Sequence, residues 1–362
     1  MSDATFLIGL FIVLLGGVCQ GAFLLPSKWM RDWEWENYWA IFALSAYLIC
    51  PLIVAFSTVP NLLDIYSTAP TNIIVITILF GFAWAVGAVL FGLGADALGL
   101  ALGFAIILGI AATSGTLIPL LIDTPEGFTA TQGWVTAISL IVMLIGVVTC
   151  SFAGRWQEQQ ESGNKAGNYR KGVILCVSSG LLAASGGLGF AFGEPLYASA
   201  ISEDLPAHVA SNALLPILMP PMFLINAGYA IFLMARNKTA DRYRRSRSGI
   251  NTILALIMGI IWLAGMALYG NGANQMGPLG TSLGWSILLS SMIIVANVLG
   301  VLSGEWKGAP RKSFGQLLLG LMILLVAVAG LGYANYLQEP SAQPISDHTD
   351  PTAASPVTGE GP

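Results

Sequence analysis

The chain has 362 residues, of which 55% are hydrophobic and only 9% are charged. Soluble domains carry about 25% charged residues, so this chain has too few charges to cover a water-facing surface. The composition therefore excludes a soluble globular protein and predicts an all-α integral membrane protein. The net charge of −4 identifies no partner by itself, because the positions of the charges carry the information.

Ten apolar segments follow one another along the chain, each close to the ~20 residues that a helix needs to cross a bilayer. Helices are the expected spanning form, because the segments are longer and more uniformly apolar than the strands of a membrane barrel. The expected helices are 5–26, 38–58, 72–94, 97–121, 134–153, 172–194, 212–235, 250–271, 279–303 and 314–336.

The loops between these segments differ sharply in charge. All 15 Lys and Arg residues fall in the loops that follow the first, fifth, seventh and ninth segments. Cytoplasmic loops are enriched in Lys and Arg, so we expect these four loops in the cytoplasm and both termini outside. Topology and contact with anionic lipid explain the basic run Arg242–Arg247 better than nucleic-acid binding does.

The sequence is also internally duplicated. Gly81-Phe-Ala-Trp84-Ala-Val-Gly87 recurs as Gly259-Ile-Ile-Trp262-Leu-Ala-Gly265, at an offset of 178 residues (259 − 81). Each copy contains five helices, an odd number, so the second copy is expected to enter the membrane from the opposite side. Secondary transporters use such inverted repeats and bind their solute near the midplane between the copies.

The duplication and the loops divide the chain into four expected parts. They are a first five-helix repeat at 1–155, a cytoplasmic linker at 156–171, a second repeat at 172–336 and a disordered outer tail at 337–362.

Polar side chains inside the segments are candidate solute ligands, because polar groups are unfavourable in the bilayer. Trp84 and Trp262 lie near the middle of their segments, where an indole N–H needs a polar partner. A sugar would provide one, and packing against a neighbouring helix is the alternative. The further candidates are Gln20, Asn226 and Asn297, whose carboxamides suit a neutral polyol or a bond between helices, and Tyr269.

Acidic and polar residues at the segment ends are candidates for coupling and gating. Glu194, at the outer end of the sixth segment, is the candidate proton carrier. Candidate gating or interface residues are Glu36, Glu305, Asp96 and Asn274. The four cysteines lie in apolar runs and both histidines lie in outer segments, so we expect no metal, no cofactor and no enzymatic activity.

Six short motifs also carry a family resemblance. They are Pro26-Ser-Lys28, Trp33-Glu-Trp35-Glu36-Asn-Tyr-Trp39, Pro60-Asn61 with Tyr66-Ser67, Phe80-Gly81-Phe-Ala-Trp84, Leu98-Gly99 and Gly304-Glu305-Trp306-Lys307. Together they resemble the bacterial L-rhamnose–proton symporter family, a branch of the drug/metabolite transporter superfamily, from residue 5 to about 336. The resemblance implies proton-driven sugar uptake across the bacterial inner membrane and peripheral fifth and tenth helices.

The expected function is therefore secondary active transport of a small neutral polar solute, a monosaccharide such as L-rhamnose, by proton symport with alternating access. Sodium coupling, facilitated diffusion and export of another metabolite remain alternatives. A membrane-embedded enzyme or a scaffold is disfavoured, because neither explains duplication around polar residues at mid-depth. The expected partners are the sugar, the proton and the lipid bilayer, with a homodimer possible and nucleic acid not expected.

Overall fold

The computed structural model describes residues 3–98, 100–123, 131–161, 169–198, 201, 205–304 and 306–337. Within these residues the chain is helical and has no strand. Ten helices among them are long and apolar enough to cross a membrane, which confirms the predicted fold class. These spans, numbered one to ten, are Asp3–Trp29, Trp35–Thr58, Thr71–Ala95, Gly103–Ile122, Thr131–Gly154, Arg170–Ala198, Ser211–Asn237, Ser248–Ala273, Gly280–Leu302 and Arg311–Tyr336.

Several spans consist of more than one helical piece. Spans one to five comprise α1 (Asp3–Ala22) with η1 (Leu25–Trp29), α2 (Trp35–Leu44) with the π-helical turn η2 (Ser45–Ile49) and α3 (Cys50–Thr58), α5 (Thr71–Leu98), α6 (Leu100–Asp123) and α7 (Thr131–Glu161). Spans six to ten comprise α8 (Tyr169–Ala183) with α9 (Ser185–Gly193) and α10 (Pro195–Ala198), η4 (Ser211–Leu214) with α12 (Leu215–Leu218) and α13 (Pro220–Asn237), α14 (Ser248–Ala273), α15 (Gly280–Leu302) and α16 (Arg311–Tyr336). The connections contain α4 (Leu62–Thr68), α11 (Ala207–Ala210) and η5 (Ala240–Arg244).

Prolines account for two of the interruptions. Pro220 and Pro221 begin α13 and separate it from α12, because neither can donate a backbone hydrogen bond to the preceding turn. In span two, Pro51 is the second residue after the π-helical turn, and its missing N–H leaves the backbone upstream free to widen. Spans two and seven are therefore interrupted inside their length and not only at their ends.

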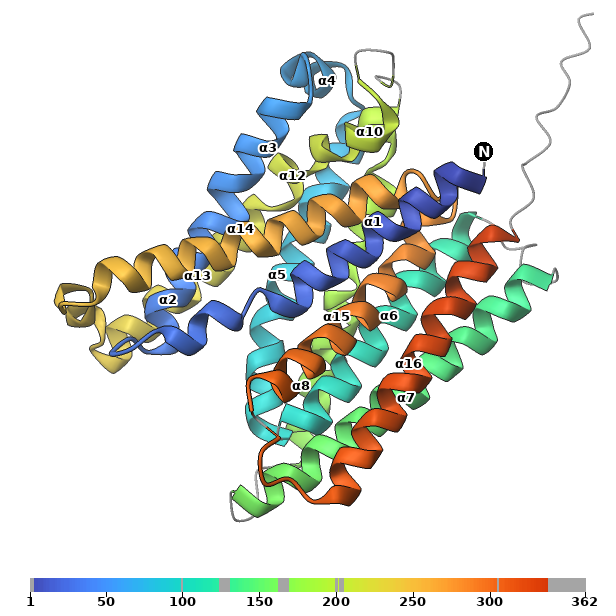
Figure 1. The fold of residues 1–362 in the computed structure, drawn as a ribbon. Coiled ribbons are helices and arrows are strands. Elements are labelled where there is room, and N and C mark those ends of the chain that lie inside the picture. Colours follow the sequence, from blue (N-terminus) through green and yellow to red (C-terminus); the bar gives the residue numbers. More distant parts are fainter. Residues whose placement is uncertain are drawn as a thin grey trace, which may run out of the picture.

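The helices pack in a pattern that recurs between the two halves. Helix α1 lies along α14 and α15, and α8 lies along α5 and α6. Helix α13 contacts both α2 and α5. Helices α7 and α16 pack on each other at one edge of the bundle (Figure 1), which agrees with the peripheral fifth and tenth helices that the family resemblance implied.

Glycines allow the closest of these crossings. A Cβ atom added at Gly265 of α14 would lie 3.0 Å from the carbonyl oxygen of Gly16 on α1. A Cβ atom added at Gly87 of α5 would lie 2.8 Å from the amide nitrogen of Ala183 on α8. Neither position has room for a side chain, so the small residues set how near the helix axes come.

One expected boundary differs from the structure. Helix α7 continues to Glu161, past the end of the fifth segment expected at residue 153, because the polar residues 157–161 are good helix formers and extend the helix beyond its apolar part. The rest of the expected linker, 162–168, and the tail from residue 338 lie outside the described residues.

Successive spans cross in opposite directions, so the connections after spans one, five, seven and nine share one side of the bundle. These connections carry the Lys and Arg residues, and we call this side the basic face. The opposite face holds the connections after spans two, four, six and eight.

Candidate functional site

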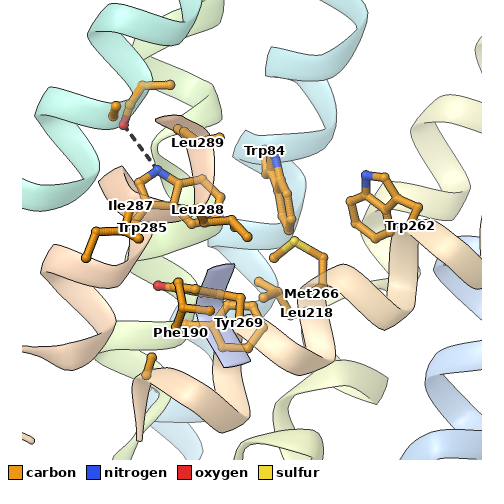
Figure 2. Packing of buried hydrophobic residues seen from close by; sticks show 14 of the residues in the cluster. Trp84, Phe190, Leu218, Trp262, Met266, Tyr269, Trp285, Ile287, Leu288 and Leu289 are labelled. Atoms are coloured by element: carbon orange, nitrogen blue, oxygen red, sulfur yellow. Dashed lines mark hydrogen bonds between the residues drawn. The ribbon is translucent and has the colours of Figure 1, made fainter. Parts of the chain in front are cut away.

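The candidate site is centred on two tryptophans from different halves of the chain. Trp84 of α5 and Trp262 of α14 lie with their ring centroids 5.7 Å apart. Their side chains are only 8% and 6% exposed. Figure 2 shows both indole nitrogens on the same side of the aromatic cluster, without a hydrogen bond to the residues drawn.

The two indole N–H groups are available to a ligand. Neither donates a hydrogen bond to any residue in the described part of the chain, and neither nitrogen belongs to the fully enclosed polar atoms that lack a partner. An indole N–H that is buried normally finds an acceptor. Two such donors side by side, neither of them fully enclosed by protein, are the arrangement expected of a polar binding site.

A third tryptophan, which the sequence did not nominate, forms one wall. Trp285 of α15 packs edge-on against Trp84 at a centroid distance of 6.0 Å, and its N–H donates to the carbonyl oxygen of Ala111 at 3.3 Å. Added Cβ atoms at Gly186 and Gly187 of α9 would fall within 2.8 Å of these rings. The glycines of span six therefore let its backbone pass directly over the indoles.

Tyr269 closes the site toward the opposite face. Its ring packs edge-on against Phe190 at 5.1 Å and against Trp285 at 5.5 Å. Its hydroxyl donates to the carbonyl oxygen of Thr281 at 2.6 Å, and the residue is fully buried. The structure thus places Tyr269, a candidate ligand from the sequence, at the cluster, but its hydroxyl already has a partner in the protein.

Span two supplies the other wall. Tyr47 of η2 stands perpendicular to Trp262 at a centroid distance of 4.8 Å, and Phe42 of α2 lies 6.4 Å from the same ring. The sequence gives no periodic signal for this contact, because it depends on where the π-helical turn crosses α14.

The three candidate carboxamides do not gather equally around the tryptophans. Gln20 of α1 is buried, and its Nε2 donates to the backbone oxygen of Trp262 at 2.8 Å. Asn226 Oδ1 accepts from the indole of Trp39 at 3.2 Å, and Asn297 Nδ2 donates to Ile293 of its own helix at 2.8 Å. Gln20 is therefore the carboxamide that the fold brings to the tryptophan pair, while the other two make helix contacts.

The coupling and gating candidates lie near the ends of the spans. Glu194, between α9 and α10, is exposed at the opposite face. Asn274, at the end of α14, accepts a hydrogen bond from the hydroxyl of Tyr197 at 3.0 Å and so ties α14 to α10. Glu305 and the side chain of Asp96 lie outside the part of the chain that the structure describes.

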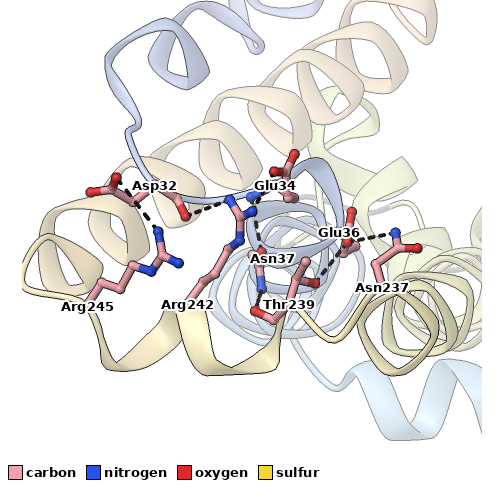
Figure 3. Close-up of polar contacts among 8 residues, drawn as sticks. All are labelled: Asp32, Glu34, Glu36, Asn37, Asn237, Thr239, Arg242 and Arg245. Carbon is pink, nitrogen blue, oxygen red and sulfur yellow. Dashed lines mark hydrogen bonds and ion pairs between the residues drawn. The ribbon is translucent and has the colours of Figure 1, made fainter.

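Glu36 is the buried acid of the basic face (Figure 3). It is 4% exposed, and its Oε1 accepts hydrogen bonds from Asn237 Nδ2 at 3.0 Å and from Thr239 Oγ1 at 2.9 Å. Next to it, Asn37 Nδ2 donates to the backbone oxygen of Thr239 at 3.0 Å. The Trp-x-Trp-Glu motif is thus built into a contact between span two and the connection after span seven.

Exposed ion pairs border this cluster. Arg242 pairs with Glu34 at 2.8 Å, and Arg245 reaches Asp32 at 4.0 Å. The hydroxyl of Tyr243 donates to the backbone oxygen of Asn37 at 2.7 Å. Burial is the main cause that raises the pKa of Tyr243 above its ordinary value. The connection after span seven is therefore held to the start of span two, and to the residues just before it, by several hydrogen bonds and ion pairs.

Ten spans around a central aromatic cluster define a polytopic membrane protein with a candidate binding site at its core. A family model described as L-rhamnose-proton symport protein (RhaT) matches residues 1–335. The chain therefore belongs to the L-rhamnose-proton symport protein family. The family is one of transporters, which confirms the prediction of a transporter and not an enzyme.

Proteins named L-rhamnose-proton symporter are similar along nearly the whole chain. The protein of Citrobacter koseri is 28% identical over 342 residues, which cover 90% of this chain and 98% of that protein. The protein of Escherichia coli K12 is 28% identical over 343 residues, with coverage of 90% and 98%. That of Cronobacter sakazakii is 29% identical over 341 residues, with coverage of 90% and 97%.

Proposed function

We propose that this chain takes up a monosaccharide, L-rhamnose or a sugar of similar shape, by proton symport across the bacterial inner membrane. The observation that carries the proposal is the pair of indole N–H donors on Trp84 and Trp262. An aromatic face packs against the C–H surface of a sugar, while an N–H group at its edge donates to a sugar hydroxyl. The relatives named L-rhamnose-proton symporter support both the solute and the coupling ion.

The surroundings of the site favour an uncharged solute. Among the described residues, Glu36 is the one buried side chain that carries a charge, and it lies at the basic face, away from the tryptophans. A charged solute at the centre of the bundle would lose its hydration without gaining an opposite charge. A sugar loses only hydrogen bonds to water, which the indoles and Gln20 can replace.

We infer that the two halves are an inverted repeat, because their contacts correspond. Gly87 and Gly265 occupy equivalent positions in the duplicated motif, and each lies at a close helix crossing, Gly87 against span six and Gly265 against span one. Trp84 and Trp262, also equivalent, meet each other. A solute between them is enclosed by both halves, so rocking of one helix group against the other would alternate its access.

The orientation and the coupling residue complete the proposal. The basic face is cytoplasmic by the positive-inside rule, so both termini lie outside. Glu194 is then an exposed acid on the outer side of span six, where it can take up a proton from the medium before the solute enters. Asn274 and Tyr197, next to it, form part of an outer gate.

Uptake into proteoliposomes tests the proposal. Labelled L-rhamnose should accumulate unchanged when the outside is acidic, and a protonophore should abolish the accumulation. Trp84→Phe and Trp262→Phe, which keep the ring surface, should retain measurable binding, whereas the two Ala variants should lose it while still folding. If no neutral sugar accumulates, or if the sugar is chemically converted, the proposed function is wrong.

A further inference from the structure

Tyr47 occupies an unusual place in the fold. It lies on the π-helical turn η2, is 3% exposed, and packs perpendicular to Trp262. Phe42 covers its other side at a centroid distance of 5.4 Å. Single π-helical turns inside α-helices occur frequently at functional sites.

The hydroxyl of Tyr47 has no hydrogen-bond partner within the described residues, although the ring is buried. The other two buried tyrosines that the structure describes both use theirs, since Tyr197 donates to Asn274 and Tyr269 donates to Thr281. The Tyr47 oxygen is also not among the fully enclosed unpartnered atoms, so a ligand can reach it. A buried hydroxyl without a partner in the protein needs a hydrogen bond from water or a ligand.

The position of Tyr47 relative to the tryptophans is fixed by the backbone. Ser45 Oγ donates to the carbonyl oxygen of Leu256 on α14 at 3.1 Å, and a Cβ atom added at Gly259 would lie 2.8 Å from the amide nitrogen of Ala46. Span two is therefore pressed against the same helix that carries Trp262, less than one turn away from it. A small solute held by Trp262 has the Tyr47 ring as its neighbour.

We propose that Tyr47 is a further solute-binding residue, whose hydroxyl bonds one particular sugar hydroxyl and so decides which monosaccharides are accepted. This inference rests on the proposed function. An indole N–H can only donate, whereas a phenol both donates and accepts, so Tyr47 can form a bond that neither tryptophan can replace. A site built to bond a hydroxyl rejects analogues that lack it, more strongly than an apolar pocket rejects a missing methylene.

The test combines Tyr47→Phe with a series of monodeoxy derivatives of L-rhamnose, as competitors of labelled L-rhamnose exchange in proteoliposomes. The wild-type protein should bind one derivative about 10–100-fold more weakly than L-rhamnose, because the buried Tyr47 hydroxyl is then left without its hydrogen bond. Tyr47→Phe should weaken the binding of L-rhamnose by a similar factor. It should bind that one derivative as tightly as the wild-type protein does. For every other derivative, the loss of affinity from the missing sugar hydroxyl and the loss from the missing Tyr47 hydroxyl should add, because they concern separate contacts.

Tyr66→Phe is the matched control. The Tyr66 hydroxyl, in α4 of the opposite face, donates to the backbone oxygen of Ala213 at the start of span seven at 2.7 Å, so loss of this hydroxyl should weaken the binding of all the sugars alike. If Tyr47→Phe also weakens the binding of every derivative by one common factor, or weakens the binding of none, Tyr47 is a packing residue. The inference is then wrong, while the proposed function stands. If the wild-type protein exchanges no sugar at all, the proposed function fails and the role of Tyr47 fails with it.

Discussion

Replacing Glu36 by Ala removes the acceptor at the centre of the polar cluster in Figure 3. Its Oε1 accepts from Asn237 and Thr239, and hydrogen bonds to a charged group contribute roughly 1.5–3 kcal/mol each. Water can replace Glu36 at Asn237, which is exposed, but not at Thr239, which is buried. We therefore take the lower value, roughly 1.5 kcal/mol, for each of the two bonds, which gives an expected loss of about 3 kcal/mol in the free energy of unfolding.

Glu34→Ala is the matched control, two residues earlier in the same motif. The Glu34 side chain is 51% exposed, and its ion pair with Arg242 at 2.8 Å lies at the surface. Exposed ion pairs contribute roughly 0–1 kcal/mol, so this variant should be nearly as stable as the wild type.

Thermal unfolding of the two purified variants in the same detergent provides the measurement. At roughly 1–2 °C per kcal/mol for a chain of this length, Glu36→Ala should lower Tm by about 3–6 °C, and Glu34→Ala by no more than about 2 °C. Equal shifts in the two variants would show that the buried carboxylate stabilises the contact between span two and the connection after span seven no more than a surface charge does. The reasoning from burial would then be refuted.

Three further outcomes are expected. Gly87→Ala should lower the free energy of unfolding by about 1–3 kcal/mol through overpacking against Ala183. Gly228→Ala has open space around its added methyl group and should raise the free energy of unfolding by up to about 1 kcal/mol. Equal Tm shifts of the two variants would contradict the close packing of α5 on α8 at Gly87. In a chain without its four native cysteines, an impermeant thiol reagent should reach a cysteine at the exposed Ser246 only from the cytoplasm and one at the exposed Ser67 only from outside, and the reverse labelling would overturn the orientation. Glu194→Gln should abolish sugar accumulation driven by a pH gradient but preserve exchange of labelled sugar, and unchanged accumulation would remove Glu194 from the coupling.

The number and limits of the spans could be predicted from the sequence, because the length and apolarity of a segment are local properties. The eighth segment, expected at 250–271, is Ser248–Ala273 in the structure. The interruption at Pro220 was equally predictable, since proline breaks a helix by its own covalent geometry. The repeat also nominated Trp84 and Trp262, because equivalent positions of two fused copies tend to meet near their common axis.

The surroundings of that pair were decided by the tertiary structure alone. Whether a buried polar group is free depends on which backbone or side chain happens to face it, and the sequence does not state this. Tyr269 and Tyr47 look alike as apolar-segment tyrosines, yet only the first finds an acceptor, at Thr281. Glu36 likewise finds its partners 201 and 203 residues along the chain, because helix crossings and not sequence spacing bring donors and acceptors together.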